Sequence, residues 1–179
     1  MQVILCGANP GVTLFDGTRV TAYASLWQVD WSERGAGRAI VLWRDGQVRV
    51  LTDELALGSW LEHAFTRHFP ETIGLDWPTP VVERTPVDFT LNLAYGLDAS
   101  AADVRITLSR PLDRRAFQTD DFALDGVPHG LRLVLIPVEH AEISVDGVAL
   151  PGVVRRGGTP DRPGSSAFLT TAEVWLRLG

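Results

Sequence analysis

Histidine side chains are the first groups in this chain that could carry chemistry, either as proton carriers or as metal ligands. His63 and His68 are five positions apart, about 140° around a helix, so the two rings cannot share one ion as an i, i+4 pair does. His140 shares a strand face with Glu142, but that face lies opposite the apolar one and should be solvated. We therefore predict no metal site and no cofactor, and we take His129 and His140 as candidate proton carriers.

A second candidate is the segment 151–166, in which arginines alternate with glycines and prolines. Arg155 and Arg156 are adjacent there, and guanidinium groups beside freely accessible backbone N–H groups can grip a phosphate or a carboxylate. Both residues are therefore candidate ligand-binding residues. The alternative is an irregular, mobile, solvated connection whose arginines pair with acids such as Asp161, and we favour it because most loops are simple connectors.

Six tryptophans give the remaining hint of function, and core filling accounts for most of them. Trp175 is the exception, because a strand that points Val174 and Leu176 inward places Trp175 beside Glu173 on the other face. A large aromatic ring on that face predicts a covering layer, a partner subunit or a bound ligand. Trp175 therefore joins the two arginines as a candidate ligand-binding residue.

The absence of lysine excludes several mechanisms, since all 16 basic side chains are arginine. Schiff-base chemistry needs a lysine amine, and the phosphate-binding P-loop needs its Gly-Lys-Ser/Thr sequence. Gly58-Ser59-Trp60 lacks the glycine spacing of a hydrolase nucleophile elbow, and the adjacent Asp120 and Asp121 point apart in a strand or turn. No motif names a reaction, so the sequence does not decide whether the chain is an enzyme.

Charge and cysteine content bear on partners and location. The net charge of −6 argues against nucleic-acid partners and against an anionic membrane surface. Cys6 is the single cysteine, so no internal disulfide forms, and a cytoplasmic location fits such a chain. We expect residues 3–6 to form the first strand rather than part of a signal peptide. Composition leaves self-association into a homo-oligomer open.

Asp-Gly dipeptides organise the chain into predicted hairpins. A two-residue type I′ turn needs positive φ at both central positions, which Asp tolerates and Gly adopts freely. The four dipeptides are Asp16-Gly17, Asp45-Gly46, Asp125-Gly126 and Asp146-Gly147. Around the second, the predicted register pairs Trp43 with Val48 and Val41 with Val50, which makes one face of the hairpin apolar.

Hydrophobic periodicity predicts further strands and a single helix. Alternation marks strands at 87–95, 104–108 and 141–145, and the last strand at 167–178 is expected to close the sheet. The nearly all-apolar run 131–136 predicts a central strand covered on both faces. Only one stretch has helical spacing, and with Thr52 or Asp53 as N-cap it predicts a helix over 53–69.

Together these patterns predict a mainly β fold, an antiparallel β-sandwich or barrel with one amphipathic helix near 53–69, in a single β-rich domain over residues 1–179. The favoured function is binding of a small, largely apolar ligand in the cavity of the sandwich or barrel. One alternative is a cofactor-independent enzyme of cyclase, isomerase or hydrolase type in the same cavity, with His129 or His140 as proton carrier. The other is a carbohydrate-binding or protein-interaction module that uses an exposed Trp175.

Overall fold

The computed structural model describes all residues 1–179, and strands make up most of it, as predicted. In chain order the strands are β1 (Gln2–Ala8), β2 (Gly11–Asp16), β3 (Arg19–Ser32), β4 (Gly37–Arg44), β5 (Gln47–Thr52), β6 (Val81–Arg84), β7 (Asp88–Asn92), β8 (Gly96–Ala101), β9 (Val104–Pro111), β10 (Arg115–Leu124), β11 (Val127–Val145), β12 (Val148–Ala149), β13 (Val153–Val154), β14 (Arg156–Gly158), β15 (Pro163–Ser165) and β16 (Ala167–Arg177). The helical segments are α1 (Leu55–Ala64) and the short 3-10 turns η1 (Thr66–His68) and η2 (Pro70–Thr72). No helix of the structure is both long enough and apolar enough to cross a membrane.

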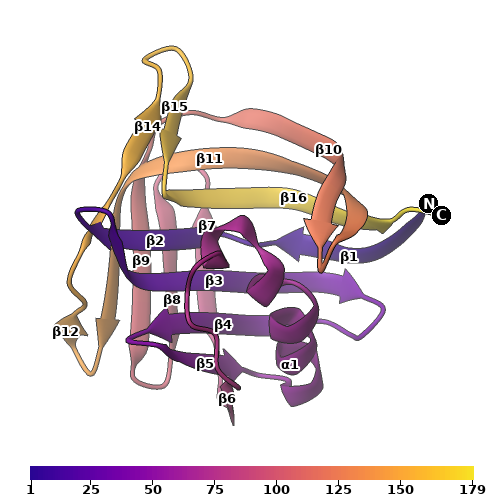
Figure 1. The fold of residues 1–179 in the computed structure, drawn as a ribbon, viewed down its shortest axis with the longest axis horizontal. Helices are drawn as coiled ribbons and strands as arrows, with labels where there is room; N and C mark the ends of the chain where they lie inside the picture. Colours follow the sequence, from indigo (N-terminus) through magenta and orange to yellow (C-terminus); the bar gives the residue numbers. More distant parts are fainter.

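All strands except β14 and β15 form one large sheet that folds back on itself. Its hydrogen-bonded order is β6-β5-β4-β3-β1-β16-β11-β9-β8-β7, and the only parallel pair is β5 with β6. Figure 1 shows β1 to β5 and β16 running across the front, while β7, β8 and β9 pass behind them in a crossing direction. The last strand, β16, therefore lies in the middle of the sheet, and the expectation that it closes the sheet is wrong.

Strand β11 belongs to both halves of the folded sheet. It is 19 residues long, and its first part pairs with β10 and β16. Its second part pairs with β9 and β12. The partners change around Pro137, because the pairs with β10 and β16 end at Leu135 and Pro137 and the pairs with β9 begin at Val138. This strand carries the chain from the front half to the back half.

Two hydrophobic cores cover the two faces of the front strands. The inner core lies between the front and back halves, and the outer core lies under α1 and the 3-10 turns. Alternation along β3 divides its side chains between them, since Ala24 and Leu26 enter the inner core and Tyr23 and Trp27 enter the outer core. Strands β3, β4 and β5 are therefore buried on both faces.

Helix α1 confirms the single predicted helix but is shorter than 53–69. Leu57 and Leu61 pack on the outer core, and the helix ends at Ala64 because Phe65 takes a non-helical backbone with φ −123° and ψ −74°. The Phe65 ring then contacts the Trp27 ring edge-on, with centroids 5.5 Å apart. The N-cap is Glu54, with no side-chain cap, so the expected capping by Thr52 or Asp53 is wrong.

Asp53 and Thr52 have other hydrogen bonds. The Asp53 carboxylate accepts from the backbone N–H of Arg38, 2.9 Å away, which ties the start of the helix to β4. The Thr52 hydroxyl donates to the carbonyl of Arg38, 2.9 Å away. Because these bonds hold the side chains of Thr52 and Asp53 against β4, neither of them caps the helix, and Glu54 occupies the N-cap position.

Three of the four Asp-Gly dipeptides form the two-residue turns predicted for them. Asp45, Asp125 and Asp146 have φ of 50°, 51° and 53°, and the glycine that follows each of them also has a positive φ. The pairing around Asp45-Gly46 is the predicted one, with Trp43 opposite Val48. The first turn is displaced by one residue, because Asp16 pairs with Arg19 and Gly17, at φ 60°, takes the first central position.

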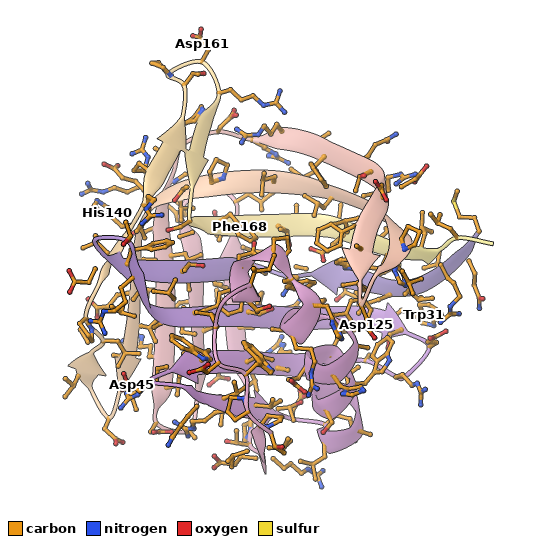
Figure 2. All side chains as sticks on the ribbon, viewed as in Figure 1. Trp31, Asp45, Asp125, His140, Asp161 and Phe168 are labelled. Carbon is orange, nitrogen blue, oxygen red and sulfur yellow. The ribbon has the colours of Figure 1, made fainter.

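The segment 151–166 is more regular than expected. Strand β13 pairs with β2, and β14 and β15 form a small separate hairpin. Figure 2 shows Asp161 at the tip of this hairpin, which projects from the body of the molecule. The glycines and prolines therefore build a short strand pair rather than an irregular connection, which corrects the sequence prediction.

Replacing Trp43 with Ala should lower the free energy of unfolding by roughly 3 to 5 kcal/mol. The Trp43 side chain is 8% exposed within the outer core, and its indole N–H donates to the carbonyl of Asp76 at 2.8 Å. Urea unfolding measures the change. Trp31→Ala is the matched control, because Trp31 is 51% exposed and its loss should stay within about 0.5 kcal/mol. Equal effects of the two substitutions would contradict this account of the core.

Candidate functional site

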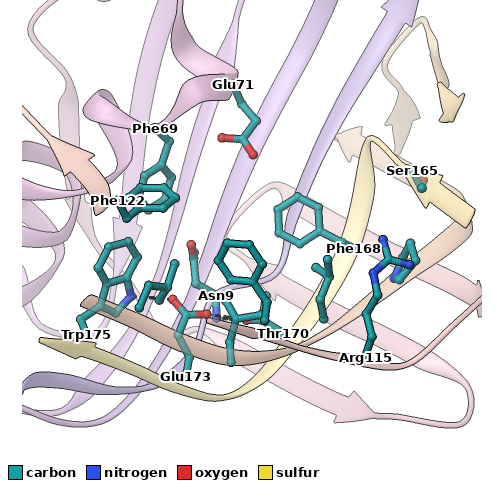
Figure 3. Close-up of a pocket in the computed structure, with 16 residues that line it drawn as sticks. Asn9, Phe69, Glu71, Arg115, Phe122, Ser165, Phe168, Thr170, Glu173 and Trp175 are labelled. Carbon is teal, nitrogen blue, oxygen red and sulfur yellow. Dashed lines mark hydrogen bonds between the residues drawn. The ribbon is translucent and has the colours of Figure 1, made fainter. Parts of the chain in front are cut away.

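A cavity of about 280 Å³ is lined mainly by residues of β10, β11 and β16. Its floor is formed by β10, β11 and β16, and the 3-10 turn η2 lies over it (Figure 3). Half of its 16 lining residues are hydrophobic. The apolar wall consists of Phe117, Leu133, Leu135 and Phe168, and Phe69, Phe122 and Trp175 gather at one end.

The apolar wall follows from alternation in two paired strands. Leu133 and Leu135 project from the same face of β11, and in the neighbouring β10 they lie opposite Phe117 and Arg115. Leu133 and Leu135 are half-buried, so the prediction that 131–136 is covered on both faces is wrong. The second face of this apolar run lines a cavity instead of packing under a further layer of chain.

A β-bulge in β16 brings three further side chains to the cavity. Arg132 of β11 pairs with Val174 and Val134 pairs with Thr171, so β16 carries one extra residue between them. Ala172 absorbs it with φ 49°, a left-handed backbone that costs a residue with a side chain some strain. The bulge places Thr170 on the same face as Glu173 and Trp175, although 170 and 173 have opposite parity.

The Glu173 carboxyl is buried at the floor of the cavity and accepts two hydrogen bonds. The Thr170 hydroxyl donates to its Oε2 at 2.7 Å, and the Trp175 indole N–H donates to its Oε1 at 2.6 Å. The Thr170 oxygen in turn accepts from the backbone N–H of Asn9 at 2.6 Å. Burial raises the pKa of Glu173 above its ordinary value, and these hydrogen bonds partly oppose the rise.

The orientation of the Asn9 amide is fixed by its neighbours. Its Nδ2 donates to the Ser25 hydroxyl at 2.9 Å and to the carbonyl of Leu26 at 2.8 Å. A backbone carbonyl only accepts, so the nitrogen end must face it, and Oδ1 points the other way. No buried side-chain nitrogen or oxygen in the structure lacks a partner, and no group donates to Oδ1, so this oxygen is open to the cavity that Asn9 lines.

Glu71 lies on η2, and its carboxyl points down into the cavity (Figure 3). It makes no hydrogen bond or ion pair with another residue, and burial raises its pKa above the ordinary value of 4.5. The phenol of Tyr23 is close enough to feel this charge, because burial first and Glu71 second raise the pKa of Tyr23. Two acidic side chains, Glu71 and Glu173, thus face the same cavity.

Arg115 is the one basic residue that lines the cavity, and it is at the end away from Trp175 (Figure 3). Its Nη1 donates to the Asp113 carboxylate at 2.7 Å and to the carbonyl of Pro163 at 2.8 Å. The hydrogen bond from Arg115 lowers the pKa of Asp113. Its position connects β10 to the β15 strand of the projecting hairpin.

Trp175 is the one predicted site residue that lines the cavity. Its ring is 1% exposed, stacks on Phe69 with centroids 6.0 Å apart, and meets Phe122 edge-on at 5.1 Å. The predicted sharing of a face with Glu173 is present, and that face is covered by the helical segment and β10. A covering layer therefore explains the ring, and an exposed Trp175 platform is wrong.

The predicted arginines point away from the cavity. The Arg155 guanidinium sits 3.7 Å from the centre of the Phe15 ring and donates to the carbonyl of Gly17 at 2.8 Å. Arg156 is exposed and faces Glu139, with 4.0 Å between the charged atoms. Neither lines the cavity, whereas Arg115, for which no motif gave a signal, does.

The predicted histidines also lie outside the cavity. Nδ1 of the His129 ring is 2.9 Å from the carbonyl oxygen of Val127, two residues earlier. His140 is exposed at the edge of the molecule, and its Nε2 is 2.9 Å from Arg110 Nη1 (Figure 2). In the structure no three His, Cys, Asp or Glu side chains gather in a way that could hold a metal ion. The cavity carboxyls were missed because they come from a bulge and a 3-10 turn.

Comparisons with protein-family models, with curated proteins and with solved structures found no match to this chain. The site must therefore be interpreted from its own geometry.

Glu71→Gln should stabilise the protein increasingly as the pH rises. Burial raises the pKa of Glu71 in the folded state above its ordinary value of 4.5, so the unfolded chain loses this proton at lower pH than the folded chain does. The wild type therefore loses stability as the pH rises from the unfolded-state pKa to the folded-state pKa. Glutamine has no proton to lose. Urea unfolding from about pH 4 to about pH 8 should show the variant's advantage growing with pH. Glu142→Gln, an exposed position on the back half, is the matched control. A constant or shrinking difference would refute the assignment.

Proposed function

We propose that the protein binds a small, largely apolar ligand in the cavity over β10, β11 and β16. The observation that carries the proposal is a wall of apolar side chains that stay partly exposed to the cavity, because no segment of this chain packs fully against them. Leu133, Leu135 and Phe168 would each gain from the removal of water, at about 25 cal/mol for each Å² of apolar surface buried. A bound ligand would cover the apolar side chains that this chain leaves partly exposed.

The shape and chemistry of the cavity support this proposal. Its volume of about 280 Å³ is near the lower end of the range of roughly 300 to 1,000 Å³ typical of ligand pockets. Such a volume suits a ligand of one or two ring systems or a short chain. A few polar groups among mostly apolar walls are the usual composition of a small-molecule site, where they orient the ligand.

A cofactor-independent enzyme in the same cavity is the second candidate, favoured by the raised pKa of Glu71 and Glu173. The predicted proton carriers, His129 and His140, do not line the cavity. Both oxygens of Glu173 already accept hydrogen bonds, and of the two carboxyls only that of Glu71 makes no hydrogen bond with another residue. Binding is therefore the better supported of the two. We extend the proposal to a cytoplasmic location, supported by the single cysteine.

Filling the cavity tests the proposal. Wild-type protein should bind the neutral dye N-phenylnaphthylamine at one site per chain, measured by dye fluorescence and by calorimetry. Leu133→Trp should weaken this binding at least about tenfold, because the added ring occupies the ligand's volume.

Ala116→Trp is the matched control, since Ala116 is exposed on the neighbouring strand and is not among the residues that line the cavity. It should bind the dye as the wild type does. The proposal fails if the wild type does not bind the dye, or if Leu133→Trp and Ala116→Trp bind it equally. Native mass spectrometry of the purified protein adds an independent readout, because a co-purified ligand should be lost from Leu133→Trp alone.

A further inference from the structure

Hydrogen-bond acceptors dominate the polar end of the cavity. Asn9 is 8% exposed. Its Nδ2 donates to Ser25 and to the carbonyl of Leu26, and no group of the protein donates to its Oδ1. The Glu71 carboxyl makes no hydrogen bond or ion pair with another residue, and only the backbone of Glu71 itself influences it by a hydrogen bond. Glu173 supplies a further carboxyl near Asn9 on the floor of the cavity, and Glu71 faces them from η2 (Figure 3). Because Oδ1 opens onto the cavity and no group of the chain donates to it, its donor must come from a molecule in the cavity.

No positive charge of the protein reaches this group of acceptors. Glu71 and Glu173 form no ion pair, and no cationic side chain is among the groups that influence either carboxyl. Arg115 lines the cavity but is on the far side of Phe168, where it binds Asp113 and Pro163 (Figure 3). Glu173 is buried and Glu71 is half-buried, and neither has a cation beside it, whereas charged groups removed from water are normally paired.

We propose that the ligand carries a protonated amine, which binds beside Asn9, Glu71 and Glu173 while its apolar part lies along Phe168 and Leu133. The proposal rests on the binding function above and names the ligand's chemical class. An ammonium group offers up to three N–H donors and one positive charge, so it satisfies both needs at once. The aromatic rings of Phe69 and Trp175 at this end add a favourable environment for a cation.

Other polar groups complement the site less well. A hydroxyl on the ligand donates one hydrogen bond and leaves the two carboxyls without a positive charge. A ligand carboxylate adds a third acid to the group, and like charges at short range repel. Arg115 could pair with such an anion only at the other end of the cavity, beyond Phe168, where its charge is already shared with Asp113 (Figure 3).

Three probes with the same apolar part and different polar groups test this inference: phenylbutylamine, phenylbutanol and phenylbutyrate. Calorimetric titration into wild-type protein at neutral pH should rank the amine first, at least about tenfold tighter than the alcohol, with the acid weakest. In Glu71→Gln, which keeps the size of the side chain and removes its charge, the ratio of amine affinity to alcohol affinity should fall about tenfold.

Glu142→Gln removes an exposed acid from the back half of the sheet and should leave the ranking unchanged. Glu173→Gln gives a second reading of the same ratio, interpreted only if N-phenylnaphthylamine still binds to it. The inference is overturned if the alcohol or the acid binds the wild type as tightly as the amine while the dye binds normally. Failure of the dye and of all three probes to bind would instead overturn the proposed function itself.

Discussion

The fold depends on one strand being shared by two halves of a sheet. β11 pairs with β10 and β16 along its first part and with β9 along its second, so the back half is attached to the front half by continuous backbone. The partners change around Pro137, between the last pair with β10 at Leu135 and the first pair with β9 at Val138. Because β11 continues from the front half into the back half, the back strands lie behind the front ones and the inner core forms between them. This core holds Ile136, Val138 and Ile143 of β11.

The same strand also explains why the candidate site lies where it does. Helix α1 and its 3-10 turns cover β3, β4 and β5, and the outer core fills that space. The first part of β11 continues the front surface beyond this cover, so its apolar side chains end at a cavity. Leu131 is buried in the outer core and also lines the cavity, Leu133 packs against that core from the cavity side, and Leu135 continues the lining. Covered and uncovered surface are thus parts of one continuous face.

Local features were predictable from sequence, and features that depend on distant partners were not. The register around Asp45-Gly46 is right because a two-residue turn fixes its own strands. The helix was found from its apolar stripe, but its end was missed because packing of Phe65 on Trp27 decides it. Trp175 was recognised as a residue that needs a cover. Arg115 and Glu71 were missed because only tertiary structure brings them to the cavity.

The floor of the site depends on the one extra residue that β16 carries at the bulge around Ala172. Thr170 and Glu173 share a face only because one residue more than the ladder needs stands between them. A chain one residue shorter here would rotate either the part before Ala172 or the part after it by half a turn. The inner-core residue Leu169 and the cavity residue Trp175 could then no longer both keep their places. In a lineage of such proteins, a site of this kind would be gained or lost by insertion and deletion rather than by point substitution.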